Sequence, residues 1–369
     1  MGVRDWGGES TSTPETSTSG PPAVHAIPSI TPNPEPPIST LPSGRFLGIA
    51  SRLLLAAGVV LFGVLIYRIG PAAVWDNLRM IGWGFGLVLA QEGVSYLANT
   101  TAWRYAFPPP RPTIPFRTLL AARLGGEAIN NLTPTATIGG EVVRGRMLMG
   151  VVDTSAVWAS IAIAKLMQTL AQMVFVFVGL VVIAQHTQLP TGFERGLLIG
   201  LVMITTGLLT GIIMQRRGLF TAGARLGERF GLRLPERLGQ QLQQLDAEIA
   251  RFYATPGAFA LSVLCFFVGW CMGVVEVYIV LYFLDIGATV SRAMTIEVLS
   301  VAIDALFFFV PAKAGTQEGG KMVIFQILGL DPAKGLALGI VRRLRELSWS
   351  MVGLVVLARH QARRRAGER

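Results

Sequence analysis

Long apolar segments constrain the fold of this chain more than any other feature. Between residues 257 and 284 only Glu276 is charged, and between residues 155 and 184 only Lys165 is charged. A helix that crosses the hydrocarbon core of a bilayer needs about 20 mainly apolar residues, and both segments exceed that length. The sequence therefore predicts a membrane protein built as a bundle of helices.

The composition agrees with a membrane protein and argues against a soluble enzyme. Charged residues make up 15% of the 369 residues, whereas a soluble domain carries about 25%. The net charge of +10 indicates basic cytoplasmic loops, and we expect no nucleic-acid partner. The two cysteines share one apolar segment and the three histidines are scattered, so no disulfide framework or metal-ligand spacing is present in the sequence. We expect no catalytic residue, no metal and no cofactor, and a protein that is not an enzyme.

Further apolar segments predict an all-α polytopic membrane protein with six full spans and two broken helical hairpins. The six spans are expected at residues 46–67, 81–101, 155–184, 196–214, 257–284 and 334–358. Each hairpin joins two shorter helices through a loop rich in Pro or Gly, at residues 116–150 and 293–330. Such a hairpin is either re-entrant or crosses the bilayer fully, and the total becomes eight if each hairpin is counted as one span. Broken helices at membrane depth occur only where they are buried in protein or line a wet cavity.

The segments outside the spans indicate the orientation. Residues 1–44 are rich in Ser, Thr, Pro and Gly, which predicts a disordered tail. Residues 215–256 predict an amphipathic hairpin, and residues 359–369 form a basic tail. Residues 215–256, the tail 359–369 and the loop 102–117 hold fifteen arginines, against four in the loops of the opposite side. The positive-inside rule therefore places both termini in the cytoplasm. The expected location is a bacterial inner membrane.

Two stretches of the chain match at a constant separation of 177 residues and share the form acid-Ala-x5-Pro-x6-Glu-x2-base. The matching residues are Glu127 with Asp304, Ala128 with Ala305, Pro134 with Pro311, Glu141 with Glu318, and Arg144 with Lys321. After a shift of one residue, three further pairs follow: Asp153 with Asp331, Lys165 with Arg343, and Gln168 with Glu346. The match predicts a duplication, with a first repeat at residues 45–185 and a second at 186–358. Because each repeat has three spans, the repeats are expected to be inverted, which is typical of transporters.

Charged residues within the predicted membrane segments need partners, because an isolated charge at mid-bilayer costs roughly 2.5–3.5 kcal/mol. Eight are acidic: Glu92, Glu127, Glu141, Glu276, Glu297, Asp304, Glu318 and Glu346. Nine are basic: Arg123, Arg144, Arg146, Lys165, Lys313, Lys321, Arg342, Arg343 and Arg345. This near balance predicts ion pairs around a central polar cavity; the alternative is that the pairs only hold helices together.

Two of these groups of charges have the chemistry of an anion site. Glu141 and Arg144 lie at the start of a short predicted helix, whose free N–H groups and arginine suit a phosphate; the alternative is that Glu141 only complements the helix dipole. The run from Arg342 to Arg345 has more arginines than Glu346 neutralises, even if Arg342 pairs with Glu346 at i,i+4. An anionic ligand is therefore one interpretation, and snorkelling to an interface is the other.

The motifs RLGGEAINNLTPTATIGGEVVRGRML and FFVPAKAGTQEGGKMVIFQILGLDPAKGLALGIVRRLRELSW resemble a flippase-like membrane family, over roughly residues 46–358. This family includes the transmembrane half of lysylphosphatidylglycerol synthase, and the resemblance points to its hopanoid-biosynthesis-associated branch. The chain departs from the family pattern at Lys165, where an acidic residue is expected, and at Lys313. The resemblance implies that the protein moves a lipid or lipid-linked molecule between leaflets.

Together these features predict a lipid translocase that acts on a hopanoid or on an anionic or aminoacylated phospholipid. The expected substrate-binding residues are Glu92, Arg123, Glu127, Asn130, Glu141, Arg144, Lys165, Glu276, Asp304, Gln317, Glu318, Lys321, Arg342, Arg343, Arg345 and Glu346. The expected hinge and loop residues are Pro134, Gly139, Gly140, Pro311, Gly315, Gly319 and Gly320. The alternatives are a lipid-modifying transferase and a non-transporting scaffold of a lipid-synthesis complex. The expected partners are the membrane lipid and proteins of lipid biosynthesis.

Overall fold

A computed structural model describes residues 71–132, 138–186, 193–230, 235–307 and 315–367, together with Tyr67. The chain divides into two units, Met1–Gly44 and Arg45–Arg369, and all described residues belong to the second. Several expectations fall outside the described residues: the tail at 1–44, the first span at 46–67 apart from Tyr67, the loop residues Pro134 and Pro311, and Lys313.

The described ranges contain twelve α-helices and no strand, which confirms the all-α prediction. The helices are α2 (Pro71–Ile81), α3 (Gly84–Tyr105), α4 (Phe116–Leu132), α5 (Ile138–Leu148), α6 (Thr154–His186), α7 (Phe193–Arg216), α8 (Leu219–Arg229), α9 (Glu236–Tyr253), α10 (Pro256–Phe283), α11 (Val290–Leu306), α12 (Thr316–Ile327) and α13 (Pro332–Gly367). In this part of the chain, α6 and α10 are the two helices that are both long and apolar enough to cross a bilayer by that composition alone. The count of six spans stays a prediction.

Several helices differ from those predicted. Helix α2 was not expected, because its eleven residues are too few for a span. Helix α3 begins at Gly84 and ends at Tyr105, not at 81 and 101. Helix α12 begins at Thr316, five residues before the predicted start at 321, directly after Gly315 adopts a left-handed conformation with φ of 73°. Helix α13 continues to Gly367 instead of ending at 358, because the basic segment beyond it consists of good helix formers and contains no Pro.

The paired glycines expected in loops lie inside helices instead. Gly139 and Gly140 belong to α5, and Gly319 and Gly320 belong to α12. A Cβ atom at Gly320 would approach Cγ2 of Ile303 to 2.7 Å, and one at Gly140 would overlap the backbone of α4. Gly140 and Gly320 therefore allow the two helices of each hairpin to pack closely. All four glycines lie in helices and not in the expected loops, whereas their expected role as hinges stays a prediction.

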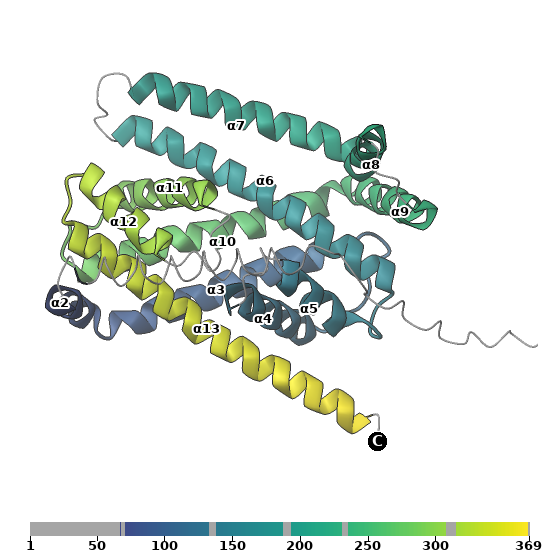
Figure 1. Ribbon diagram of the computed structural model, residues 1–369, viewed down its shortest axis with the longest axis horizontal. Helices are drawn as coiled ribbons and strands as arrows, with labels where there is room; N and C mark the ends of the chain where they lie inside the picture. The colour runs from purple at the N-terminus through teal and green to yellow at the C-terminus, as the bar shows by residue number, and fades with distance from the viewer. Residues whose placement is uncertain are drawn as a thin grey trace, which may run out of the picture. The chain divides into compact units, whose positions relative to one another are not determined.

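Helices from the two halves of the sequence pack against one another. Helix α10 lies along α3 and α6, while α13 lies along α4 and α12 (Figure 1). The broken hairpins are α4 with α5 and α11 with α12. Helix α13 contacts the first hairpin through α4, and α6 contacts the second through α11, so each hairpin touches the long helix that ends the other half.

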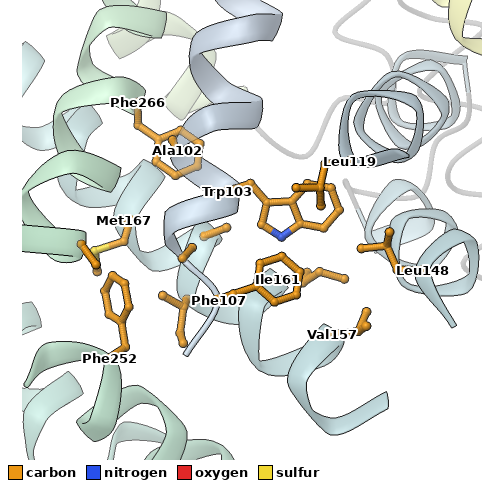
Figure 2. Close-up of a cluster of buried hydrophobic side chains, with 14 of the residues drawn as sticks. Ala102, Trp103, Phe107, Leu119, Leu148, Val157, Ile161, Met167, Phe252 and Phe266 are labelled. Atoms are coloured by element: carbon orange, nitrogen blue, oxygen red, sulfur yellow. The ribbon is translucent and has the colours of Figure 1, made fainter. Parts of the chain in front are cut away.

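The largest apolar cluster joins α3, α4, α5, α6, α9 and α10. Trp103 lies near its centre, beside Leu119, Leu148 and Ile161, and is 1% exposed (Figure 2). Its indole N–H donates to the hydroxyl of Ser160 at 3.2 Å, so its polar atom is satisfied although it is buried. This cluster holds the C-terminal end of α3 and the N-terminal half of α6 against α9.

Helices α8 and α9 form a pair of amphipathic helices at the same end. Two backbone N–H groups at the start of α8, those of Phe220 and Thr221, donate to the carboxylate of Asp246 on α9 at 3.1 and 2.7 Å. The inner face of α9 places Ile249 and Phe252 in the apolar cluster. The two helices thus cover the cluster with one face and present polar side chains on the other.

Candidate functional site: a buried ionic network and its cavity

Arg342 on α13 forms the most buried ion pairs of the described residues. Its Nη2 atom lies 2.9 Å from Oε2 of Glu276 on α10 and 2.7 Å from Oε2 of Glu297 on α11. The side chains of Arg342 and Glu297 are 7% exposed, and that of Glu276 is fully buried. One guanidinium therefore joins three helices with charge-assisted hydrogen bonds, which are the strong kind.

Arg345 lies one turn further along α13 and extends this network. Its Nη1 atom lies 2.7 Å from Oε2 of Glu276 and 3.0 Å from Oε2 of Glu92 on α3. The carboxylate of Glu276 is thus shared by two arginines of one helix face, as the i,i+3 spacing predicts.

Arg343 points to a different side of α13. Its Nε atom lies 3.2 Å from Oε1 of Glu318 on α12, and its Nη1 atom lies 3.1 Å from Oε2 of Glu346. Glu346 therefore pairs with Arg343, not with Arg342 as the i,i+4 spacing suggested, because Arg342 faces carboxylates of α10 and α11. The excess of arginine on α13 is balanced by carboxylates from four other helices, which spacing along one helix does not reveal.

A second group of charges joins α4, α5 and α6. Nη2 of Arg144 lies 2.6 Å from Oε2 of Glu127, and Nη1 lies 3.7 Å from Oε1 of Glu141. Lys165 Nζ lies 3.5 Å from the same oxygen of Glu141. The N–H of Gly140, in the first turn of α5, donates to Oδ1 of Asn130 at 2.8 Å. The groups that suggested an anion site are thus engaged with protein partners.

Two further cations lie deep in the protein. Arg123 is 5% exposed, lies 5.8 Å from the ring centroid of Phe266, and its Nε atom has no hydrogen-bond partner among the described residues. Lys321 is 1% exposed, and its Nζ atom donates to the backbone carbonyl of Gln317 at 3.4 Å. Arg123 lines the same small space as Arg144, whereas the hydrogen bond of Lys321 stays within α12.

The ionic network lines a cavity of about 720 Å³ between the two halves of the bundle. Six carboxylates line it: Glu92, Glu127, Glu276, Glu297, Asp304 and Glu346. Two arginines line it, Arg342 and Arg345, and both pair with carboxylates. We call this space the central cavity. Because acidic groups outnumber basic groups three to one there, its lining is acidic.

The expected site residues fall into three groups. Eight line the central cavity: Glu92, Glu127, Glu276, Asp304, Gln317, Arg342, Arg345 and Glu346. Four line a small adjoining space between α4, α5 and α6: Arg123, Glu141, Arg144 and Lys165. The remaining four make other contacts. Asn130 accepts from the N–H of Gly140, Glu318 pairs with Arg343 between α12 and α13, and Lys321 bonds a backbone carbonyl of its own helix.

Some cavity residues were absent from the expected set. They are Asn131, Gln168, Gln172, Trp270, Glu297 and Ser300. Gln168 and Gln172 are amides four residues apart in the most apolar part of α6. This spacing puts both on one helix face and could have identified them as cavity residues. Glu297 was recognised as a charge at depth, but its link to Arg342 requires the packing of α11 on α10.

Comparison with known proteins agrees with this architecture. The chain matches the family described as "Lysylphosphatidylglycerol synthase TM region" over residues 49–354. The chain belongs to this family. A "UPF0104 membrane protein" of Methanothermobacter thermautotrophicus is 24% identical over 320 residues, which cover 83% of this chain and 93% of that protein. No solved structure matches the chain at a significant level. The family resemblance inferred from the motifs is confirmed, and the hopanoid branch stays a prediction.

Proposed function

We propose that the protein is a lipid translocase in which a headgroup crosses the bilayer through the central cavity while the acyl chains stay in the lipid. The observation that carries this proposal is the cavity itself, a space of about 720 Å³ lined by eight charged side chains within an all-helical membrane protein. Ligand sites commonly have volumes of about 300–1,000 Å³. Charged side chains inside a membrane protein mark substrate or ion pathways.

Unsatisfied polar atoms at the cavity support a ligand there. Among the described residues, Oε1 of Glu276, Oε1 of Gln317 and Nε of Arg345 are buried without a hydrogen-bond partner. All three belong to residues that line the central cavity. Buried polar groups in native proteins nearly always have a partner, so a polar headgroup would complete these groups.

The charge of the lining favours some headgroups over others. Six carboxylates against two arginines suit a headgroup that offers ammonium or hydroxyl donors. Because Arg342 and Arg345 already bond carboxylates, a bare anion would have to displace those partners. Among the candidate substrates, an aminoacylated phospholipid or a hopanoid with a polar, donor-rich headgroup therefore fits better than an anionic phospholipid.

The proposal includes two inverted repeats, and two pairs of contacts support them. The matched residues Glu141 and Glu318 each pair with a cation on the following long helix, Lys165 at 3.5 Å and Arg343 at 3.2 Å. These two cations also match each other in the sequence repeat.

The matched aspartates supply the second pair of contacts. Asp153 accepts from the N–H of Ser155 at 3.0 Å at the start of α6, and Asp331 accepts from the N–H of Ala333 at 2.8 Å at the start of α13. Inverted repeats of this kind alternate access to a central site by moving one repeat against the other.

We further propose that both termini and the α8–α9 pair lie on the cytoplasmic side of a bacterial inner membrane. The six spans and two broken hairpins of the sequence prediction are part of this proposal. The energy for transport would come from an ion gradient or from lipid mass action, and the protein would act as a transporter, not as an enzyme.

The test is mass spectrometry of the lipids that the purified protein retains. The variant is the double substitution Glu92→Gln with Arg345→Gln, which removes one acid and one base that pair at 3.0 Å and so keeps the formal charge of the cavity. The control is Arg79→Gln, an exposed arginine on α2. We expect one lipid class to be enriched by the wild type and the control and lost in the double variant.

Other results of this experiment contradict the proposal. Retained lipid that mirrors the bulk membrane in all three samples would argue for a scaffold. A chemically altered lipid that accumulates on incubation with the wild type would argue for the transferase.

A further inference from the structure

A second large space lies between the first turns of α6 and one stripe of α9. We call it the lateral pocket; its volume is about 790 Å³. Its walls include the apolar side chains of Trp158, Leu238, Leu242 and Leu245. Glu248 and Arg251 line it near the end of α9 and pair with each other at 2.7 Å. The pocket thus combines apolar walls with one zwitterionic edge.

The lateral pocket and the central cavity both border one face of α6. Residues at spacings of three and four lie on one helix face, and Trp158, Ile161, Lys165, Gln168 and Gln172 follow that spacing. Trp158 lines the lateral pocket, whereas Gln168 and Gln172 line the central cavity. At 1.5 Å per residue, the distance from Trp158 to Gln172 is about 21 Å, most of the hydrocarbon thickness.

The space between the two is nearly closed. Ile161, Lys165 and Gln168 line a gap of about 10 Å³ together with Glu141 and Arg144, a volume at the lower limit for one water molecule. Glu141 and Lys165 both line this gap and pair across the α5–α6 contact at 3.5 Å, with the Lys165 side chain 51% exposed. A polar constriction therefore separates two spaces that are each large enough for part of a lipid.

We propose that the lateral pocket binds a membrane lipid and is the site from which a headgroup passes to the central cavity when the Glu141–Lys165 pair opens. This inference rests on the proposed transport function. The amphipathic pair α8–α9 places the pocket at the level of a membrane interface. The apolar walls suit the upper part of an acyl chain, and the Glu248–Arg251 pair offers both charges to a polar headgroup.

The occupant is identified by photocrosslinking of the full chain in vesicles of equal parts phosphatidylethanolamine and phosphatidylglycerol. A benzophenone amino acid replaces Leu238, which lines the lateral pocket and is 38% exposed. The matched control replaces Leu226, an exposed leucine on α8 that is not among the lining residues. Ala247→Trp, at an exposed position that lines the pocket, fills the space without disturbing the core.

We expect a lipid adduct at position 238 that exceeds the one at 226 and falls about tenfold when Ala247→Trp is added. An equal yield at both positions would mean only bulk lipid, and would overturn the proposal. A peptide adduct at position 238, from this chain or from a second copy, would also overturn it. If the adduct at 238 is selective but the wild type moves no lipid between leaflets, the transport function fails while the lateral lipid site stands.

Discussion

Removal of the Arg342 guanidinium should be one of the most destabilising single changes in the protein. Arg342→Met keeps an unbranched apolar stem but removes the guanidinium group, which leaves the buried carboxylates of Glu276 and Glu297 without the partner that lies within 3 Å of both. Deleting one member of a buried ion pair costs about 3–5 kcal/mol, because the other charge stays in a low-dielectric site. Glu276 keeps Arg345 at 2.7 Å, so most of the cost arises at Glu297.

The expected change is measurable as a shift in thermal unfolding. For larger chains about 1 kcal/mol shifts Tm by roughly 2 °C, so Arg342→Met should lower Tm by about 6–10 °C on the cited cost of 3–5 kcal/mol. The assay is tryptophan fluorescence of the purified protein in detergent. The matched control is Arg251→Met, whose pair with Glu248 also measures 2.7 Å but whose side chain is 57% exposed. An exposed pair contributes about 0–1 kcal/mol, and the control should shift Tm by at most about 2 °C.

A compensating variant separates charge from packing. Glu297→Gln added to Arg342→Met removes the uncompensated charge, and should recover most of the lost stability, because neutral replacements of buried ion pairs are often well tolerated. If Arg342→Met and Arg251→Met lower Tm equally, the central cavity screens its charges as well as the protein surface does, and the reasoning is refuted.

Three further predictions concern single contacts. Gly353→Ala would place a Cβ atom against the backbone of α4, so it should cost about 1–3 kcal/mol by forcing α13 away, and an unchanged Tm would contradict that close contact. The pKa of Asp153 lies below its usual value because it accepts hydrogen bonds from the Ser155 hydroxyl and nearby backbone N–H groups; its contribution is therefore full above the unfolded pKa of about 3.9 and lost as pH falls below it. Asp153→Ala should flatten the fall in Tm on acidification relative to the wild type, and parallel curves would contradict this. Glu141→Lys and Lys165→Glu should each lower the rate of lipid exchange in vesicles more than the double variant that carries both substitutions. If the double variant instead loses the sum of the two single losses, the pair does not act as a unit.

The helices were predictable wherever the signal is local. Long apolar segments with few charges placed α6 and α10 within one or two residues of their observed bounds, since membrane helices satisfy all their backbone hydrogen bonds internally. The hairpin helix α4 was predicted at its observed bounds. In contrast, α13 continues through its basic end, where composition suggested a tail and helix propensity decided the outcome.

The candidate site was predictable in composition but not in pairing. Most of its charges were identified because a charge at membrane depth needs a partner. The partners of Arg342 are 66 and 45 residues away, and no spacing rule within one helix connects them. The acidic character of the central cavity depends on which side chains face it, and that is fixed by the packing of α10, α11 and α13.

The lateral pocket had no signal in the sequence, because it is formed by two helices that are separated by α7 and α8. Glycine pairs in the hairpins were predicted as hinge or loop residues, whereas they lie in helices, and Gly140 and Gly320 allow a close approach of the neighbouring helix. In both cases the deciding information is tertiary packing, which local residue patterns do not contain.

The most direct test of this account is the rate at which a lipid exchanges between leaflets of vesicles that contain the purified protein. The lipid is the class that the protein retains, and the vesicles compare the wild type with the Glu92→Gln, Arg345→Gln double variant. The account predicts that the wild type accelerates exchange over protein-free vesicles and that the double variant returns it to that background while its Tm stays near that of the wild type. Equal acceleration by both proteins would show that the headgroup does not pass through the central cavity.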